Sequence, residues 1–184
     1  MNKMIYSMII VFVFLLTTGC DKSNPIGEEN HSIFEVIEHA AIHMVSGPVH
    51  IVNAIAALPG THIEPDSMEH HRLDIALLDT DTLKGGYVHF GPDVTGDLLI
   101  MTNVPARIRL VNRTVVDSSA VDIPLEIEDR FSAEEIADSA GVTAIVQALL
   151  FEAQTGANIL CIDSVSVDTL KVVIEEADHD HHDD

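Results

Sequence analysis

The feature that most constrains the fold of this chain is an alternation of apolar and polar side chains that recurs after Pro48. In residues 71–78, Leu73, Ile75 and Leu77 alternate with Arg72 and Asp74. Such period-two runs are typical of β-strands with one buried face. The same pattern returns in three further runs, at residues 106–111, 121–129 and 169–176. The sequence therefore predicts a mainly β protein.

Short turn signals separate these runs, among them Gly85-Gly86 and Asn103-Val104-Pro105. Glycine, proline and asparagine favour the backbone conformations that reverse the chain. The chain has 184 residues, enough for one domain with a sizeable core. We therefore expect one antiparallel β-sandwich over residues 32–177. The pattern resembles the jelly-roll-like sandwiches of exported bacterial proteins, a likeness that concerns the fold alone.

A short helix is predicted before the first strand. Ser32 and Glu35 have the spacing of a capping box, and Gly47-Pro48 is a stop signal. Apolar residues between them follow the helical period. His39 and His43 are four residues apart, so this helix places both imidazoles on one face.

Residues 132–156 allow two interpretations. Ser132 and Glu135 form a second capping box, and Gly141 could end a short helix. The following residues, 143–162, are compatible with a longer helix or with a hairpin that turns at Thr155-Gly156. We favour the hairpin, because residues 158–162 need a strand as their partner.

The N-terminus has the pattern of a secretory signal peptide over residues 1–19. Lys3 precedes an apolar run at residues 8–16, too short for a spanning helix of about 20 residues. The sequence LLTTGC at residues 15–20 resembles the lipobox of bacterial lipoproteins. The resemblance implies lipid attachment at Cys20, a tether over residues 20–31, and a cell-envelope location facing the periplasm or the cell exterior. Ordinary secretion or an uncleaved N-terminal anchor is the alternative.

Charge and cysteine content exclude several classes of function. The formal net charge of −21 disfavours binding to nucleic acid through the overall field and is compatible with binding cations. Cys20 and Cys161 are the two cysteines, so a lipidated Cys20 leaves Cys161 as a free thiol in an apolar strand. Glu175 and Glu176 alternate across the last strand, and Glu175 falls on its polar face, so the two are not expected to share a ligand.

Histidines suggest a metal site. The pair His39 and His43 lacks the glutamate of the HExxH protease motif, because Ala40 follows the first histidine. Two imidazoles seldom suffice for a metal site. The other candidate ligands are His70 and His71 at the start of a predicted strand, and three histidines in the Asp-rich tail at 178–184: His179, His181 and His182. Imidazole and carboxylate ligands suit zinc first, with nickel or copper as alternatives.

These observations predict an exported, lipid-anchored protein that captures or buffers a divalent transition metal and does not catalyse a reaction. Its partners would be the membrane, through the lipid on Cys20, and a metal transporter or metal-receiving protein. The alternatives are a structural or adhesive β-sandwich lipoprotein and an enzyme whose site the sequence does not reveal. Among the other histidines, His50 is expected to face solvent and His89 to be structural, while His62 is assigned no role.

Overall fold

The computed structural model describes residues 26–63, 70–81, 83–90, 96–116, 118–154 and 156–177, with residues 26–32, 115 and 116 described in their backbone only. The chain divides after Asn30, and the fold described here is that of the unit from His31 onward. The predicted signal peptide, Cys20 and the tail histidines lie outside the described residues. Among the residues described, no helix is long and apolar enough to cross a membrane.

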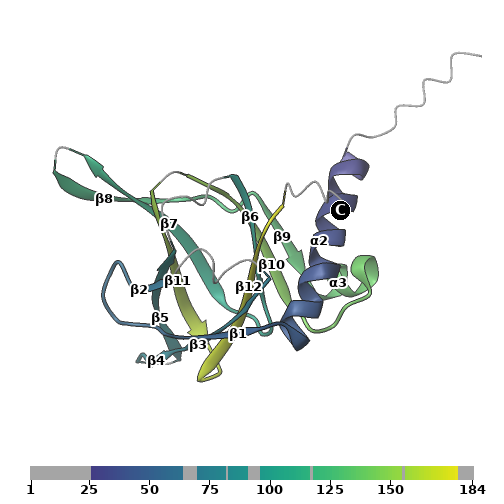
Figure 1. Ribbon diagram of the computed structural model, residues 1–184, viewed down its shortest axis with the longest axis horizontal. Helices are drawn as coiled ribbons and strands as arrows, with labels where there is room; N and C mark the ends of the chain where they lie inside the picture. The colour runs from purple at the N-terminus through teal and green to yellow at the C-terminus, as the bar shows by residue number, and fades with distance from the viewer. Residues whose placement is uncertain are drawn as a thin grey trace, which may run out of the picture. The chain divides into compact units, whose positions relative to one another are not determined.

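The described chain is mainly β, with two helices (Figure 1). The helices are α2 (Ile26–Ser46) and α3 (Ala133–Ala140). The strands are β1 (Val49–Asn53), β2 (Thr61–Ile63), β3 (Arg72–Ala76), β4 (Leu78–Asp79), β5 (Lys84–Phe90), β6 (Gly96–Thr102), β7 (Arg107–Val116), β8 (Ser119–Pro124), β9 (Asp129–Ser132), β10 (Gln147–Ala153), β11 (Ala157–Val165) and β12 (Thr169–Glu176).

The strands form two sheets, as the predicted sandwich requires. The first has the order β1-β3-β12-β6-β10-β9, and the second has the order β2-β5-β11-β7-β8, with β4 paired to β5. Most neighbours are antiparallel, which confirms that prediction for the body of the fold. Two pairings are parallel, β1 with β3 and β2 with β5, and both lie at sheet edges.

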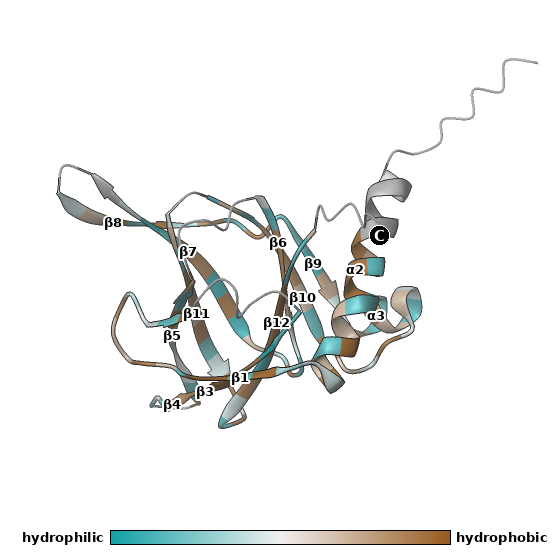
Figure 2. Ribbon diagram, viewed as in Figure 1, coloured by the Kyte–Doolittle hydropathy of each residue, from teal (hydrophilic) through white to brown (hydrophobic). Residues whose placement is uncertain are grey.

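The main core lies between the inner faces of the two sheets. Leu73, Ile75 and Val172 come from the first sheet, Phe90 and Leu110 come from the second, and all five are fully buried. Four of them are apolar members of the period-two runs, as the alternation predicts, and Phe90 comes from β5, outside those runs. The apolar stretches of β6 and β10 in Figure 2 are longer than alternation predicts, because both faces of these strands are covered.

The helices cover the outer face of the first sheet. Ile37 and Met44 of α2 pack with Leu99 of β6 and Val173 of β12 in a second apolar cluster. The Phe34 ring meets the Phe131 ring of β9 edge to face, with centroids 5.4 Å apart. Because of this helical layer, both faces of the first sheet are buried.

Some helix and strand boundaries agree with the predictions from the sequence, and others differ from them. Residues 147–153 and 157–165 are strands β10 and β11, so the longer helix is excluded. The favoured hairpin is wrong, because β10 lies in the first sheet and β11 in the second, where its partners are β5 and β7. Helix α3 has its capping box, since the Ser132 hydroxyl accepts from the Glu135 N–H and the Glu135 carboxylate accepts from the Ser132 N–H. The predicted start of the first helix at Ser32 is wrong, because α2 begins at Ile26 and takes in part of the predicted tether.

Two further expectations need correction. The run at residues 121–129 is not one half-buried strand: β8 ends at Pro124, and Val121 and Ile123 are exposed on this edge strand of the second sheet. Gly85 and Gly86 do not make a turn but lie inside β5. A Cβ on Gly85 would lie 2.6 Å from the Ile162 carbonyl oxygen, so glycine allows the two strands to approach.

Candidate metal centre

The last two turns of α2 carry the histidine pair. Ala40 and Ala41 between them are buried against the first sheet, and their small side chains let the helix lie close to it. His39 and His43 are half-buried at the edge of this contact. Their ring centroids lie 4.7 Å apart, which confirms that the spacing of four residues puts both on one face.

His70 completes a triangle of imidazoles from a distant part of the sequence. Its ring centroid lies 5.5 Å from that of His39 and 5.2 Å from that of His43. The residue has φ of 57°, the left-handed conformation that non-glycine residues seldom adopt. Strained backbone of this kind persists where the surrounding structure holds it, and it gathers at functional sites. Here it lies directly before β3, where it brings the imidazole towards α2.

Glu175 of β12 is the fourth member of the cluster, and sequence reasoning missed it. The alternation places Glu175 on the same face as Val173, opposite the main core, and an uncovered sheet would expose it there. Because α2 covers this face, the Glu175 residue is 6% exposed. Val172 of β12 pairs with Leu73 of β3 in antiparallel register. Counting three residues further along each chain in this register places Glu175 opposite His70. No sequence signal singled out Glu175, because the burial of this face depends on the packing of α2 against it.

The four residues can hold a metal ion. One donor atom from each of His39, His43, His70 and Glu175 lies within 4.8 Å of every other. Tetrahedral zinc, with bonds of 2.0–2.1 Å, needs its donors about 3.3 Å apart, so modest side-chain rotations would bring all four onto one ion. His70 is exposed while Glu175 is buried, so the group opens to solvent on the histidine side.

Two properties of the His43 side chain favour metal binding, an unpaired nitrogen and a lowered pKa. Its Nε2 atom is buried and has no hydrogen-bond partner among the described residues. An unpaired buried polar atom costs about 1–3 kcal/mol, so such atoms call for an explanation. Burial lowers the pKa of His43, and the neighbouring His39, His70 and His71 lower it further. The neutral imidazole that metal binding requires is therefore favoured.

The lowered pKa of His43 predicts a pH-dependent stability. Between this pKa and the ordinary value of about 6.5, the unfolded chain binds more protons than the folded one, so stability rises with pH. The free energy of unfolding that depends on neutral His43 is fully present above the ordinary pKa, and it is lost as the pH falls towards the lowered pKa. We expect the melting temperature of the metal-free protein to fall between about pH 7.5 and pH 5. His43→Ala should fall less over the same range in chelator-treated samples, whereas an identical pH dependence would contradict this assignment.

Arg72 holds the pieces of the site together. Its Nη1 donates to the Met44 carbonyl at the end of α2 over 3.0 Å, and its Nε donates to Asp74 over 2.8 Å. Its backbone N–H donates to the Pro48 carbonyl over 2.9 Å. A cation at a helix C-terminus is favourable. These bonds fix β3, and His70 just before it, against the helix end.

A positioning role for Arg72 predicts a loss of affinity without a loss of ligands. Arg72→Lys keeps the charge but removes the planar guanidinium group that donates to both the Met44 carbonyl and the Asp74 carboxylate. We expect zinc affinity to fall about 10-fold, by analogy with groups that orient metal ligands, with the stoichiometry unchanged. Arg107→Lys, at an exposed position of β7, is the matched control. Equal affinities in a calorimetric titration of the two variants would show that Arg72 does not position the site.

The remaining predicted ligands are not in this group. His71 lies close enough to lower the pKa of His43, yet the four-donor group does not include it. Both histidines precede β3, which begins at Arg72, and the left-handed backbone of His70 interrupts the strand alternation there. Glu38, the carboxylate next to His39 in the sequence, is exposed. His179, His181 and His182 lie outside the described residues.

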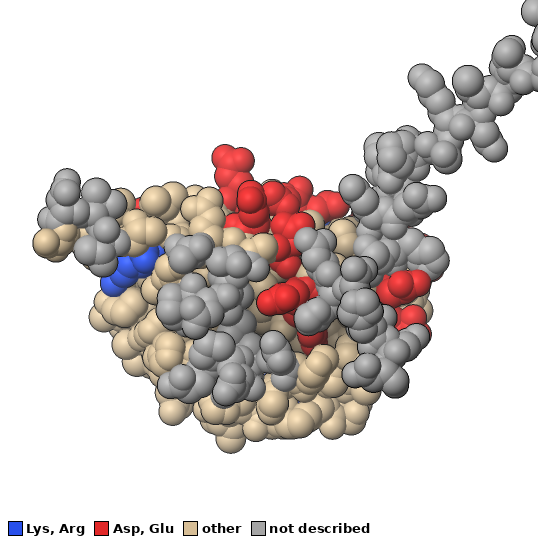
Figure 3. Space-filling model, turned by 45° about the horizontal axis from the view of Figure 1, so that its top comes forward, with Lys and Arg blue, Asp and Glu red and all other residues tan. Residues whose placement is uncertain are grey.

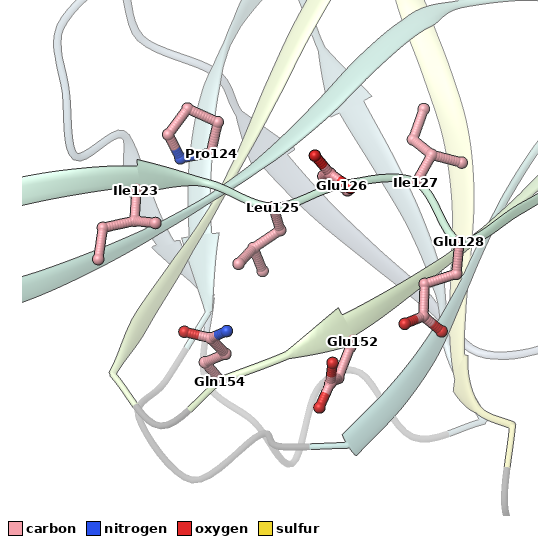
Figure 4. A pocket seen from close by; sticks show the side chains of 8 residues that line it. All are labelled: Ile123, Pro124, Leu125, Glu126, Ile127, Glu128, Glu152 and Gln154. Atoms are coloured by element: carbon pink, nitrogen blue, oxygen red, sulfur yellow. The ribbon is translucent and has the colours of Figure 1, made fainter.

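A groove lined by acidic and apolar side chains lies elsewhere on the described surface. Acidic side chains gather on the face shown in Figure 3, and Figure 4 shows a groove of about 560 Å³ between the segment after β8 and the end of β10. Leu125 and Ile127 supply apolar surface, while Glu128 and Glu152 line it with carboxylates. Partial burial raises the pKa of Glu128, and Asp97 and Glu152 raise it further.

This groove offers oxygen ligands alone, and no described residue in its lining is a histidine. The histidine cluster is therefore the better candidate for a transition-metal site. Comparison with known proteins gives no further guidance, because no family model matches the chain and no curated protein is significantly similar to it.

Proposed function

We propose that this protein binds one divalent transition metal ion through His39, His43, His70 and Glu175. The observation that carries the proposal is the convergence of four donors from three separate segments, with the buried Nε2 of His43 left without a hydrogen-bond partner among the described residues. Zinc is the first candidate, because three imidazoles and one carboxylate suit a tetrahedral site, and nickel or copper are alternatives.

Capture or buffering fits this site better than catalysis. Catalytic zinc sites keep one position open for water or substrate, whereas four protein ligands fill a tetrahedral shell. The sequence adds the histidines and aspartates of residues 178–184, which follow Glu175 closely. In the sequence, His179 follows Glu175 by four residues. The tail would concentrate ions near the folded site.

The proposed setting is the cell envelope, with the lipid on Cys20 as membrane anchor and a metal transporter or metal-receiving protein as partner. The resemblance of residues 15–20 to a lipobox supports this part. The runner-up is a structural or adhesive lipoprotein without a metal role. The acidic groove at Leu125 and Glu128 favours that alternative, because its apolar surface and carboxylates could receive a cationic partner segment.

A calorimetric titration with Zn²⁺, Ni²⁺ and Cu²⁺ tests the proposal. The chain is used in two forms, unmodified and with His179, His181 and His182 all replaced by alanine. We expect the tail-substituted form to retain one tight equivalent of zinc and to lose the weaker ones. If all binding vanishes with the tail histidines, the folded domain has no site and the structural alternative stands.

A further inference from the structure

A second histidine pair lies on the other outer face of the sandwich. His62 of β2 and His89 of β5 are partners in the parallel pairing of these strands. Their flanking residues Ile63 and Phe90 are in the main core, so both imidazoles are on the outer face of the second sheet. The Nδ1 atom of His62 lies 2.9 Å from the Nε2 atom of His89, and the ring centroids are 4.6 Å apart.

The backbone holds the two histidines in this arrangement. Gly60 has φ of 100°, and a Cβ there would lie 2.6 Å from the Tyr87 carbonyl carbon. Only glycine allows so close an approach in that conformation. The Thr61 hydroxyl donates to the Asn53 carbonyl and ties β2 to the end of β1. The positions of the rings therefore follow from strand pairing rather than from two free surface side chains.

Hydrogen bonding orients the facing nitrogens. His89 Nδ1 lies 3.3 Å from the Gly60 carbonyl, so this nitrogen is the one that carries the proton and donates. The Nε2 lone pair of His89 then points towards His62, whose Nδ1 donates to it. Burial lowers the pKa of His89, and the neighbouring His62 lowers it further, which favours neutral imidazole.

We propose that His62 and His89 form a second metal site, a two-imidazole chelate for Cu²⁺ or Ni²⁺ in which water fills the other positions, so that it binds more weakly than a site with four protein ligands. In the hydrogen-bonded pair the two nitrogens face each other 2.9 Å apart. Once the proton between them has left, rotation of the rings would aim both lone pairs at one ion about 2.0–2.1 Å from each, and this spacing corresponds to an angle of about 90° at the ion. This is the angle between neighbouring ligands in square-planar or tetragonal coordination, which Cu²⁺ and Ni²⁺ favour. A tetrahedral zinc ion would need the nitrogens about 3.3 Å apart.

Metal binding at this pair needs only a shift of one proton within His62 and no added reactant. The proton on His62 Nδ1 moves, by exchange with water, to its Nε2, and the freed Nδ1 lone pair and the His89 Nε2 lone pair bind the ion. Arg113 also acts electrostatically on His89, and its guanidinium is paired with Asp122 at 2.6 Å and 2.8 Å. The overall charge of −21 favours a cation. This site shares no residue with the metal centre of the proposed function.

The test is a Cu²⁺ titration followed by electron paramagnetic resonance. The full chain carries His39→Ala, His43→Ala and alanine at the three tail histidines, so the proposed function cannot contribute. We expect one copper equivalent with hyperfine coupling to two imidazole nitrogens, and Zn²⁺ binding weaker by at least about 10-fold. His62→Ala in this background should remove the equivalent, whereas His50→Ala, at an exposed histidine of β1, should not.

A second measurement keeps the test independent of the stability of that variant. In the otherwise unmodified chain, His62→Ala should remove one copper equivalent and leave the zinc equivalent intact. Absence of a two-nitrogen copper signal, or a signal that His62→Ala does not alter, would overturn the inference. Loss of zinc binding with retention of this copper signal would instead overturn the proposed function alone.

Discussion

Replacing His43 with alanine is expected to weaken zinc binding by at least about 100-fold. The buried Nε2 atom of His43 has no hydrogen-bond partner among the described residues, so a metal ion would be its one partner there. In the unmodified protein, zinc at 100 times its dissociation constant should add about 2.7 kcal/mol of stability, which is a rise in melting temperature of about 5–10 °C. The variant should show almost none of this rise in a thermal melt.

The control for this prediction is His50→Ala. His50 is exposed on β1 and pairs with Leu73, which places it on the face of the first sheet that is turned away from α2. The control should keep the full zinc-dependent rise. Metal-free His43→Ala should be no less stable than the parent protein, because the substitution removes a buried unsatisfied group. A zinc-dependent rise that survives in His43→Ala would contradict the role assigned to this residue.

Truncation of Phe151 should have the largest effect on stability. Its side chain is fully buried on β10, in the core between the two sheets. Phenylalanine-to-alanine changes in a core cost about 3–5 kcal/mol, because a cavity is left as well as lost burial. Domains are stable by only about 5–15 kcal/mol, so Phe151→Ala should show a much lower denaturation midpoint or not fold.

Ile51→Ala is the comparison for this second prediction. Ile51 is also apolar and in a strand, but it is 74% exposed. Its truncation should change the free energy of unfolding by less than about 0.5 kcal/mol in a denaturant titration. If the two variants had similar midpoints, the two-sheet core would be wrong.

The sequence predicts the sandwich well because its strands mostly have one buried face. Arg72 and Asp74 alternate with Leu73 and Ile75, and the structure buries the apolar members. The same rule failed for β6, because the alternation disappears when a helical layer buries the second face as well. Where a segment such as β8 extends past the opposite sheet, the alternation remains but the apolar side chains are exposed.

The candidate metal centre was predictable only in part, for a related reason. The spacing of His39 and His43 is a local property of a helix, so the sequence reveals it. That His70 and not His71 joins them depends on a left-handed residue and on strand register, which are tertiary features. Glu175 was assigned to a polar face, since the sequence does not say that α2 would cover it. The pairing of His62 with His89 was missed because β2 has three residues, too few for an alternation to be recognised in the sequence, and its parallel partner β5 is distant in the chain.

Anomalous diffraction at the zinc absorption edge tests the central claim most directly. Crystals of the chain with alanine at its three tail histidines, grown with one equivalent of zinc, would be measured on both sides of the edge. The account predicts one strong anomalous peak between α2 and β12, about 2.0–2.1 Å from nitrogens of His39, His43 and His70 and close to the Glu175 carboxylate. A well-ordered histidine cluster without a peak, or zinc bound elsewhere, would contradict it.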